Sequence, residues 1–276
     1  MRALICLQEI YTKSEITNKL SPIDKVMAKY INKVARSDTT LVQRYVKRSS
    51  GSVRGAYLEF LNNFDLVESI IRAEREGFDG VIVNCFNDPG LHIAREIVNI
   101  PVIGVCESSI HVASILGGKI AIITNSPVHI PKLAGLIERY GVRDKMISRK
   151  PIRSCNYSFP KDYIDGIKDP CKSFIPKFEK LAKECIDDGA DVIIPGCTIA
   201  ELIFDKAGYN EIGNTGVIVL FPLAVAIKMA ESLVDLKKSI GLSKSMAEYA
   251  PYGRRDVQLI KQARKRYGLD SRERSE

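Results

Sequence analysis

The stretch Gly80-Val-Ile-Val-Asn-Cys-Phe-Asn-Asp-Pro-Gly90 contains a short apolar run that stops at a cysteine and is followed by a helix-start signal. The three β-branched residues at 81–83 favour a strand that is buried on both faces, as in a parallel sheet. Asp88 and Pro89 are typical of a helix N-cap and of the first helical position. Cys85 is therefore expected where a strand ends and a helix begins, which is where open α/β sheets bind ligands.

A second stretch repeats this arrangement. Residues 190–195 are typical of a strand, Gly196 interrupts it, and Cys197 follows directly. Thr198 then begins an apolar run with helical spacing, which includes Ile199. The two cysteines therefore occupy equivalent positions in two strand-to-helix transitions.

Strand and helix signals alternate along the rest of the chain. Strands are predicted at 3–7, 39–46, 101–105, 119–123 and 216–220, and helices at 21–35, 66–76, 110–116, 131–140, 172–187 and 223–238. Residues 145–160 are predicted to be irregular, with room for one short strand. The alternation predicts an α/β fold with doubly wound parallel sheets and right-handed crossovers.

The chain is long enough for two α/β domains, and Gly117-Gly118 punctuates it near the middle. Each half contains a helix, then a strand, then one of the two cysteines. We therefore predict two similar domains, with a cysteine from each facing a shared cleft. The predicted boundaries assign residues 1–118 and 215–276 to the first domain and residues 119–214 to the second.

The 276 residues carry a formal net charge of +8, but acidic and basic residues alternate through most of the chain. The exception is the tail at 254–276, where basic residues lie on an expected exposed helix that frays at its end. We interpret this tail as solvated or subunit-contacting, which argues against nucleic acid as a partner. No apolar run reaches the roughly 18 residues of a membrane span, and the start is too short for a signal peptide, so a cytoplasmic protein is expected.

The chain has seven cysteines without a CxxC pair, and its three histidines do not have metal-ligand spacing. No metal site is predicted, and reduced thiols are expected. A disulfide between Cys155 and Cys171, which both lie in loop-like surroundings, is the alternative.

A cysteine at a helix amino terminus lies near the positive end of the helix dipole and near unpaired backbone amides. Both features are expected to lower the pKa of the thiol. Nucleophilic catalysis usually also needs a histidine base, and none of His92, His111 and His129 is placed by sequence to serve. What remains is proton transfer by two thiols on opposite faces of one substrate carbon, with helix-start amides stabilising the enolate-like charge. This scheme needs no cofactor.

Several other residues compete for or complete this site. Cys106 also follows a strand signal and is the main competitor, while Cys6 and Cys185 are interpreted as buried hydrophobic residues. The ends of other strands place polar side chains at the same sheet edge, although such residues also serve as caps. The predicted substrate-binding residues are Gln8, Phe86, Asn87, Thr124, Asn125, Thr198 and Ile199.

The segment from Asn84 to Leu91 resembles the Cys-Phe-x-Asp-Pro-Gly-Leu signature of the hydantoin racemase branch of the aspartate/glutamate/hydantoin racemase superfamily. Gly196-Cys197-Thr198 is similar to the second cysteine motif of that superfamily. The resemblance implies two pseudo-symmetric α/β domains with the active site between them. It also implies that a cysteine from each domain acts as acid or base without a metal or pyridoxal cofactor, and that the chain forms a homo-oligomer.

Three segments depart from the family pattern. Gln8-Glu9-Ile10 replaces an Asn-Pro-Asn-like turn, Thr-Ile-Ala-Glu follows Cys197, and Thr124-Asn125 replaces Thr-Thr. The expectation is a cofactor-independent racemase or epimerase of a small amino-acid derivative, either hydantoin-like or an amino acid, with an altered substrate shell. Two alternatives stay open: an enzyme resembling maleate isomerases or arylmalonate decarboxylases, and a non-catalytic protein that binds a small ligand.

Overall fold

The computed structural model describes residues 2–15, 21–245 and 254–269. Residues 1–243 form one compact unit, and residues 244–276 form a second. The second unit contains helix α11 (Arg254–Arg266), so the predicted basic helix of the tail is confirmed. The end of the tail, where fraying is predicted, includes residues 270–276, which lie outside the described residues. No helix in the described part of the chain combines the length and the apolar character needed to cross a membrane.

The first sheet has four parallel strands in the order β2-β1-β3-β4. These are β1 (Ala3–Thr12), β2 (Thr39–Val46), β3 (Gly80–Val83) and β4 (Val102–Gly104). The second sheet has the order β6-β5-β7-β8 and is also parallel. Its strands are β5 (Ile120–Thr124), β6 (Ile152–Ser154), β7 (Val192–Pro195) and β8 (Ile218–Val219). The predicted α/β class with parallel sheets is confirmed.

Helices cover both faces of the first sheet. Cys6, Val81 and Val83 pack with α3 (Ala56–Arg75) and α4 (Leu91–Ile97) on one face. The alternate residues Ile5, Leu7 and Ile82 belong to the core that includes α2 (Ser21–Val34) and α10 (Pro222–Ile240). Because both faces are buried, the strands are nearly continuous apolar runs.

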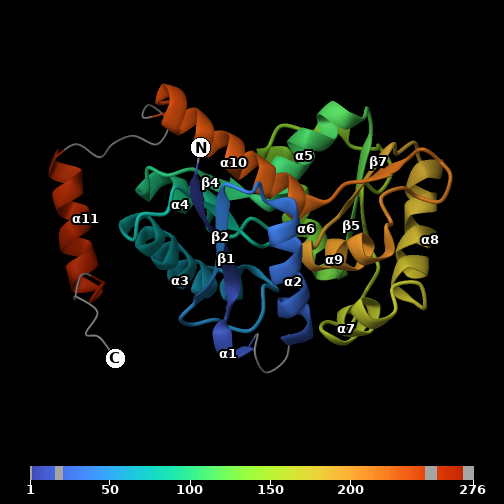
Figure 1. The fold of residues 1–276 in the computed structure, drawn as a ribbon, viewed down its shortest axis with the longest axis horizontal. Helices are drawn as coiled ribbons and strands as arrows, with labels where there is room; N and C mark the ends of the chain where they lie inside the picture. The colour runs from blue at the N-terminus through green and yellow to red at the C-terminus, as the bar shows by residue number, and fades with distance from the viewer. Residues whose placement is uncertain (1, 16–20, 246–253, 270–276) are drawn as a thin grey trace. The chain divides into compact units, whose positions relative to one another are not determined.

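The second sheet is covered in the same way. Helices α6 (Ile130–Arg139) and α8 (Phe174–Asp187) contact β6 and β5, while α5 (Val105–Leu116) and α9 (Thr198–Ala207) contact β7. Helix α7 (Lys161–Lys168) packs between α8, α9 and α2. Figure 1 shows the two halves next to each other, with α10 against α5. One apolar core extends through both halves, because α5 and α10 contribute to it from either side.

The two sheets repeat one topology. In each, the first strand in sequence lies at the second position and pairs with the second and third strands. Cys85 follows the third strand of its sheet and Cys197 follows the third strand of the other, so they hold equivalent positions. The strand pairing also places Ile218–Val219 in the second sheet, whereas the predicted boundary assigned everything from 215 onward to the first domain.

Strand β1 is longer than predicted. The prediction ended it at residue 7 because Gln8 and Glu9 are polar, but the strand continues to Thr12. Both side chains are buried and hydrogen-bonded: Gln8 accepts a hydrogen bond from the Ser69 hydroxyl at 2.6 Å, and Glu9 accepts one from Asn84 at 2.7 Å. Polar side chains can be buried within a strand when they are hydrogen-bonded. The carboxyl end of β1 therefore lies further along the chain than predicted.

The predicted start of α4 at Asp88 and Pro89 is wrong. The helix begins at Leu91, after Gly90 with φ 63°, and Asp88 itself has φ 44°. The Asp88 carboxylate instead accepts hydrogen bonds from the backbone N–H groups of Cys106 and Glu107, at 3.0 and 2.8 Å. Asp88 therefore caps the first turn of α5 rather than its own helix.

The helix predicted at 110–116 begins earlier, at Val105, directly after β4. Cys106 consequently lies in the first turn of α5 and is fully buried. It does not stand at an open strand end, which removes it as a competitor for the site. The helix predicted at 66–76 also begins earlier, at Ala56, because the exposed Tyr57 and Phe60 in its first turns hide the pattern of a buried face.

Candidate active site

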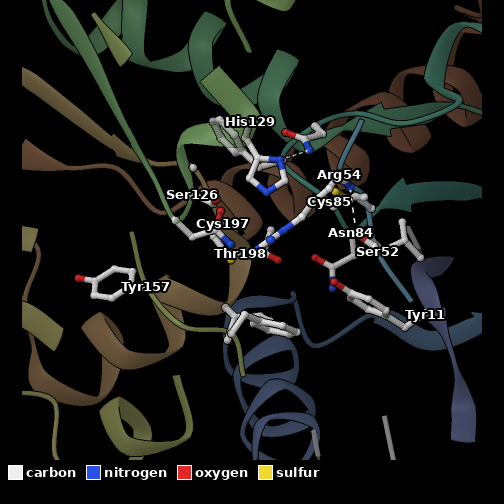
Figure 2. A pocket seen from close by; sticks show the side chains of 18 of the residues that line it. Tyr11, Ser52, Arg54, Asn84, Cys85, Ser126, His129, Tyr157, Cys197 and Thr198 are labelled. Carbon is white, nitrogen blue, oxygen red and sulfur yellow. Dashed lines mark hydrogen bonds between the residues drawn. The ribbon is translucent and has the colours of Figure 1, made fainter. Parts of the chain in front are cut away.

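A cavity of about 350 Å³ opens at the carboxyl ends of strands from both sheets. Its walls come from the end of β1, the loop at 51–54, the segment after β3, the segment after β5, residues 157 and 159, and the segment after β7. Figure 2 shows this cavity with both cysteines beside it. The position agrees with the general rule that ligands of open parallel sheets bind outside the carboxyl ends of the strands.

The Cys85 corner is a tight turn held by the backbone. The N–H of Cys85 donates to the Val83 carbonyl at 2.8 Å, and the N–H of Asp88 donates to the Cys85 carbonyl at 3.1 Å. The N–H of Asn87 donates to the Cys85 sulfur. The turn therefore presents the thiol to the cavity with one hydrogen-bond donor beneath it.

The Cys197 corner supplies more donors. Cys197 is the N-cap residue of α9, and its sulfur accepts hydrogen bonds from the backbone N–H groups of Ile199 and Ala200 and from the Tyr163 hydroxyl. Gly196 allows the corner to approach β5, because a Cβ there would meet the Thr124 backbone at 3.1 Å. A helix start, a tyrosine and a close strand together fix the position of this sulfur.

The pKa values of both thiols differ from the expectation of a lowered pKa. Burial raises the pKa of Cys85 to about 12 and outweighs the Asn87 donor. Burial also raises the pKa of Cys197, although the Tyr163, Ile199 and Ala200 donors oppose it. The prediction considered the helix terminus but not the loss of water around each sulfur, which disfavours the thiolate. Burial therefore favours the protonated thiol over the thiolate at both positions.

Most of the predicted site residues are brought together. Cys85, Cys197, Phe86, Asn87, Asn125, Thr198 and Ile199 all line the cavity. Gln8 and Thr124 do not: Gln8 is fully buried within β1, and Thr124 is buried at the end of β5. Ile10 and Tyr11, further along β1, take the place at the cavity that was expected for Gln8. The Tyr11 ring stacks on Phe159 with 6.3 Å between ring centroids and closes one side.

His129 lines the cavity, although the sequence reading treated it as ordinary structure. Its Nδ1 lies 3.0 Å from the side-chain nitrogen of Asn87. An amide NH₂ can only donate, so Nδ1 accepts and the neutral ring carries its proton on Nε2. Burial lowers the pKa of His129, and the positive charge of Arg54 lowers it further. The signal that could have identified His129 is its place shortly after the end of β5, where Thr124 and Asn125 were already predicted site residues.

Arg54 is a second cavity residue that was missed. It lies in the Ser- and Gly-rich loop before α3, where no site residue was predicted from the sequence. Asn62 holds this loop: its side chain accepts from the Ser50 N–H at 2.8 Å and donates to the Ser52 carbonyl at 2.7 Å. Figure 2 shows the Arg54 side chain extending into the middle of the cavity, below the His129 ring.

Asn84 connects the cavity to a buried polar network. Its side-chain NH₂ donates to Glu9 at 2.7 Å, and Gln43 donates to the same Glu9 oxygen at 2.9 Å. The Asn84 amide oxygen is buried and has no hydrogen-bond partner among the residues that the structure describes. Burial raises the pKa of Glu9 from 4.5 to about 7, with the two amide donors opposing the shift.

The raised pKa of Glu9 predicts a pH-dependent stability. The folded state holds the Glu9 proton more tightly than the unfolded chain does, so this contribution is complete below pH 4.5 and is lost as the pH rises through 7. We expect the free energy of unfolding to fall over this range by up to about 3 kcal/mol more in the wild-type protein than in Glu9→Gln. Denaturant titrations at several pH values measure this difference. Glu138→Gln, on the surface, is the control, and parallel pH curves for wild type and Glu9→Gln would contradict the assignment.

Among the described residues there is no group of three or more His, Cys, Asp or Glu side chains that could hold a metal ion. All seven cysteines lie in described segments and are free thiols, with Cys155 buried and Cys171 exposed. The chemical groups at the cavity are therefore two thiols, a neutral imidazole, a guanidinium and several amides and hydroxyls.

Comparison with known proteins gives consistent results. A family model described as Asp/Glu/Hydantoin racemase matches residues 26–230. A hydantoin racemase from Pseudomonas sp. (strain NS671) is 32% identical over 210 residues, which cover 74% of this chain and 78% of that protein. The resemblance drawn from the two cysteine motifs is confirmed.

Two solved structures share the fold. Allantoin racemase from Klebsiella pneumoniae has a TM-score of 0.72 at 23% identity and covers 91% of this chain and 95% of its own. Glutamate racemase from Francisella tularensis subsp. tularensis SCHU S4 has a TM-score of 0.55 at 17% identity, with 88% and 84% covered. These two likenesses support the architecture of paired parallel sheets.

Proposed function

Because the chain belongs to the Asp/Glu/hydantoin racemase family, we propose that it racemises or epimerises a small amino-acid derivative, hydantoin-like or an amino acid, by proton transfer between Cys85 and Cys197. The observation that carries this proposal is the placement of the two thiols. Each follows the equivalent strand of its own sheet, and both line one cavity. Two acid/base groups that approach one carbon from different sides can remove a proton from one face and deliver another to the opposite face.

The surroundings of the two sulfurs suggest different resting roles. Within the described part of the chain, three donors, from Tyr163, Ile199 and Ala200, point to the Cys197 sulfur, and one, the Asn87 N–H, points to the Cys85 sulfur. Donors to sulfur stabilise a thiolate. We therefore assign the first thiolate to Cys197 and the first proton donor to Cys85. After one turnover the protonation states are exchanged, and reaction of the opposite enantiomer restores them.

The developing charge on the substrate also needs stabilisation. When the carbon next to a carbonyl loses its proton, negative charge moves to the carbonyl oxygen. The backbone at the two corners and the side chains of Asn125 and Thr198 supply polar groups at the cavity wall for that oxygen. Such interactions gain strength where the protein displaces water from around the charge.

The direct test is solvent deuterium exchange. A panel of D- and L-amino acids, hydantoins and dicarboxylates is incubated with the protein in deuterated water. For a substrate we expect deuterium at the α carbon together with inversion of the stereocentre and without release of carbon dioxide. NMR measures the incorporation of deuterium, and chiral chromatography measures the inversion.

The same experiment tests the alternatives. Release of carbon dioxide would indicate a decarboxylase, and cis–trans isomerisation without α-deuterium would indicate an enzyme of the maleate isomerase type. Binding without any exchange across the panel would favour a ligand-binding protein and would overturn the proposed racemisation.

A further inference from the structure

The cavity carries a positive charge that nothing in the described part of the protein neutralises. Arg54 reaches into the cavity, and among the described residues no carboxylate forms an ion pair with it. None of the cavity-lining residues is acidic. The acidic side chain in the first turn of the following helix, Glu59, is paired with Lys132 at 2.5 Å. A guanidinium in this position offers two parallel N–H donors suited to a carboxylate.

His129 adds a neutral donor to the same part of the cavity. The hydrogen bond from Asn87 fixes the proton on Nε2, and burial together with the Arg54 charge keeps the ring neutral by lowering its pKa. Figure 2 shows the His129 ring directly above the Arg54 side chain. The two side chains therefore present several N–H groups, one of them from a cation, to one region.

Asn84 offers a hydrogen-bond acceptor to the ligand, whereas Arg54 and His129 offer donors. The Asn84 NH₂ donates to Glu9, so the amide oxygen faces away from that carboxylate. In the described part of the chain this buried oxygen has no hydrogen-bond partner. Figure 2 shows it on the cavity side of the residue. A buried acceptor without a donor costs free energy, which a ligand N–H would recover. A charged ammonium would find no carboxylate at the cavity wall, so a neutral N–H fits better.

We propose that the substrate is an anionic ureide or N-acylated amino-acid derivative, whose carboxylate binds Arg54 and His129 and whose neutral N–H binds the Asn84 amide oxygen. This inference rests on the proposed function, because it describes the substrate of the two-cysteine site. It differs from a neutral hydantoin, which leaves Arg54 without a counter-charge. It also differs from a free amino acid, which brings an ammonium into a cavity lined only by neutral and cationic groups.

Two ligands of similar shape but different charge test whether the cavity prefers a carboxylate. Binding of 5-(2-carboxyethyl)hydantoin, 5-(2-carbamoylethyl)hydantoin and glutamate to the full chain is measured by calorimetry. The first two differ only in the charge of the side-chain end. We expect the wild-type protein to bind the carboxylate about 10- to 100-fold more tightly than the amide, as expected for a charge-assisted hydrogen bond, and more tightly than glutamate.

Variants of Arg54 test whether this residue causes the preference for the carboxylate. Arg54→Gln should lower the affinity for the carboxylate more than the affinity for the amide and so remove the preference, whereas Arg54→Lys should retain part of it. Arg75→Gln, an exposed change of the same charge at the far end of α3, is the control for net charge and should keep the full preference. Equal affinities for the two hydantoins in the wild type, or an undiminished preference in Arg54→Gln, would overturn the inference.

Affinity and exchange are recorded separately, so the two proposals can fail independently. A charge preference that depends on Arg54 supports the substrate class even if no α-deuterium is incorporated, in which case only the racemase reaction fails. If Arg54→Gln instead lowers the exchange rate of both hydantoins equally and leaves their affinities unchanged, Arg54 serves the reaction and not recognition, which also overturns the inference.

Discussion

Replacing Cys85 or Cys197 by serine is expected to lower the rate of racemisation by about 10³-fold or more, with little change in substrate affinity. A serine hydroxyl is a far weaker acid than a thiol, so it cannot become the base, and it donates a proton poorly. Both thiols are already disfavoured as thiolates by burial. The remaining thiol is therefore not acidic enough to take over the proton transfer of the replaced one. Chiral chromatography of the substrate measures inversion, and calorimetry measures affinity.

The two variants should differ in the enantiomer on which they still act. Each retains one thiol, which can remove and return a proton on its own face of the substrate without inversion. We expect Cys85→Ser to exchange deuterium into one enantiomer and Cys197→Ser into the other. Cys171→Ser, which replaces an exposed cysteine outside the cavity, should behave as wild type. Full racemisation by Cys197→Ser would remove the two-thiol scheme.

The corners that hold the cysteines could be predicted because their signals are local. A β-branched run that is buried on both faces, followed by a break and a helical pattern, identifies the transition at Val83 and again at Pro195. Parallel pairing then places the two thiols at carboxyl ends of strands. The pairing of equivalent corners across one cavity needed only the assumption that the halves repeat, and the strand orders agree with it.

Other features depend on contacts between distant segments and could not be read locally. Gln8 and Glu9 ended the predicted strand because their partners, Ser69 and Asn84, lie far away in sequence. Arg54 was missed because the loop that carries it is fixed by Asn62, and that interaction has no sequence signature. The direction of the thiol pKa shifts was wrong because burial depends on the complete fold.

Asp88 is the residue whose role differs most from its local pattern. It matches a helix N-cap in sequence, yet its carboxylate joins the Cys85 turn to the start of α5 and accepts a third hydrogen bond, from the Tyr140 hydroxyl, at 2.7 Å. The fit is close, because a Cβ at Gly104 would lie 2.7 Å from the Asp88 carboxylate. This buried cluster fixes the backbone beneath the thiol.

We expect Asp88→Ala to lower the free energy of unfolding by about 3 kcal/mol or more, because it leaves two backbone N–H groups and one hydroxyl buried without an acceptor. Alanine also tolerates the left-handed backbone at this position poorly, with φ 44°. Asp88→Asn, which accepts this backbone conformation, should be intermediate, and Tyr140→Phe, which removes a single donor, should cost about 1 kcal/mol. Denaturant unfolding measures the series against the exposed Asp187→Ala. Equal stabilities of Asp88→Ala and Asp187→Ala would show that the carboxylate is not what joins the Cys85 turn to α5.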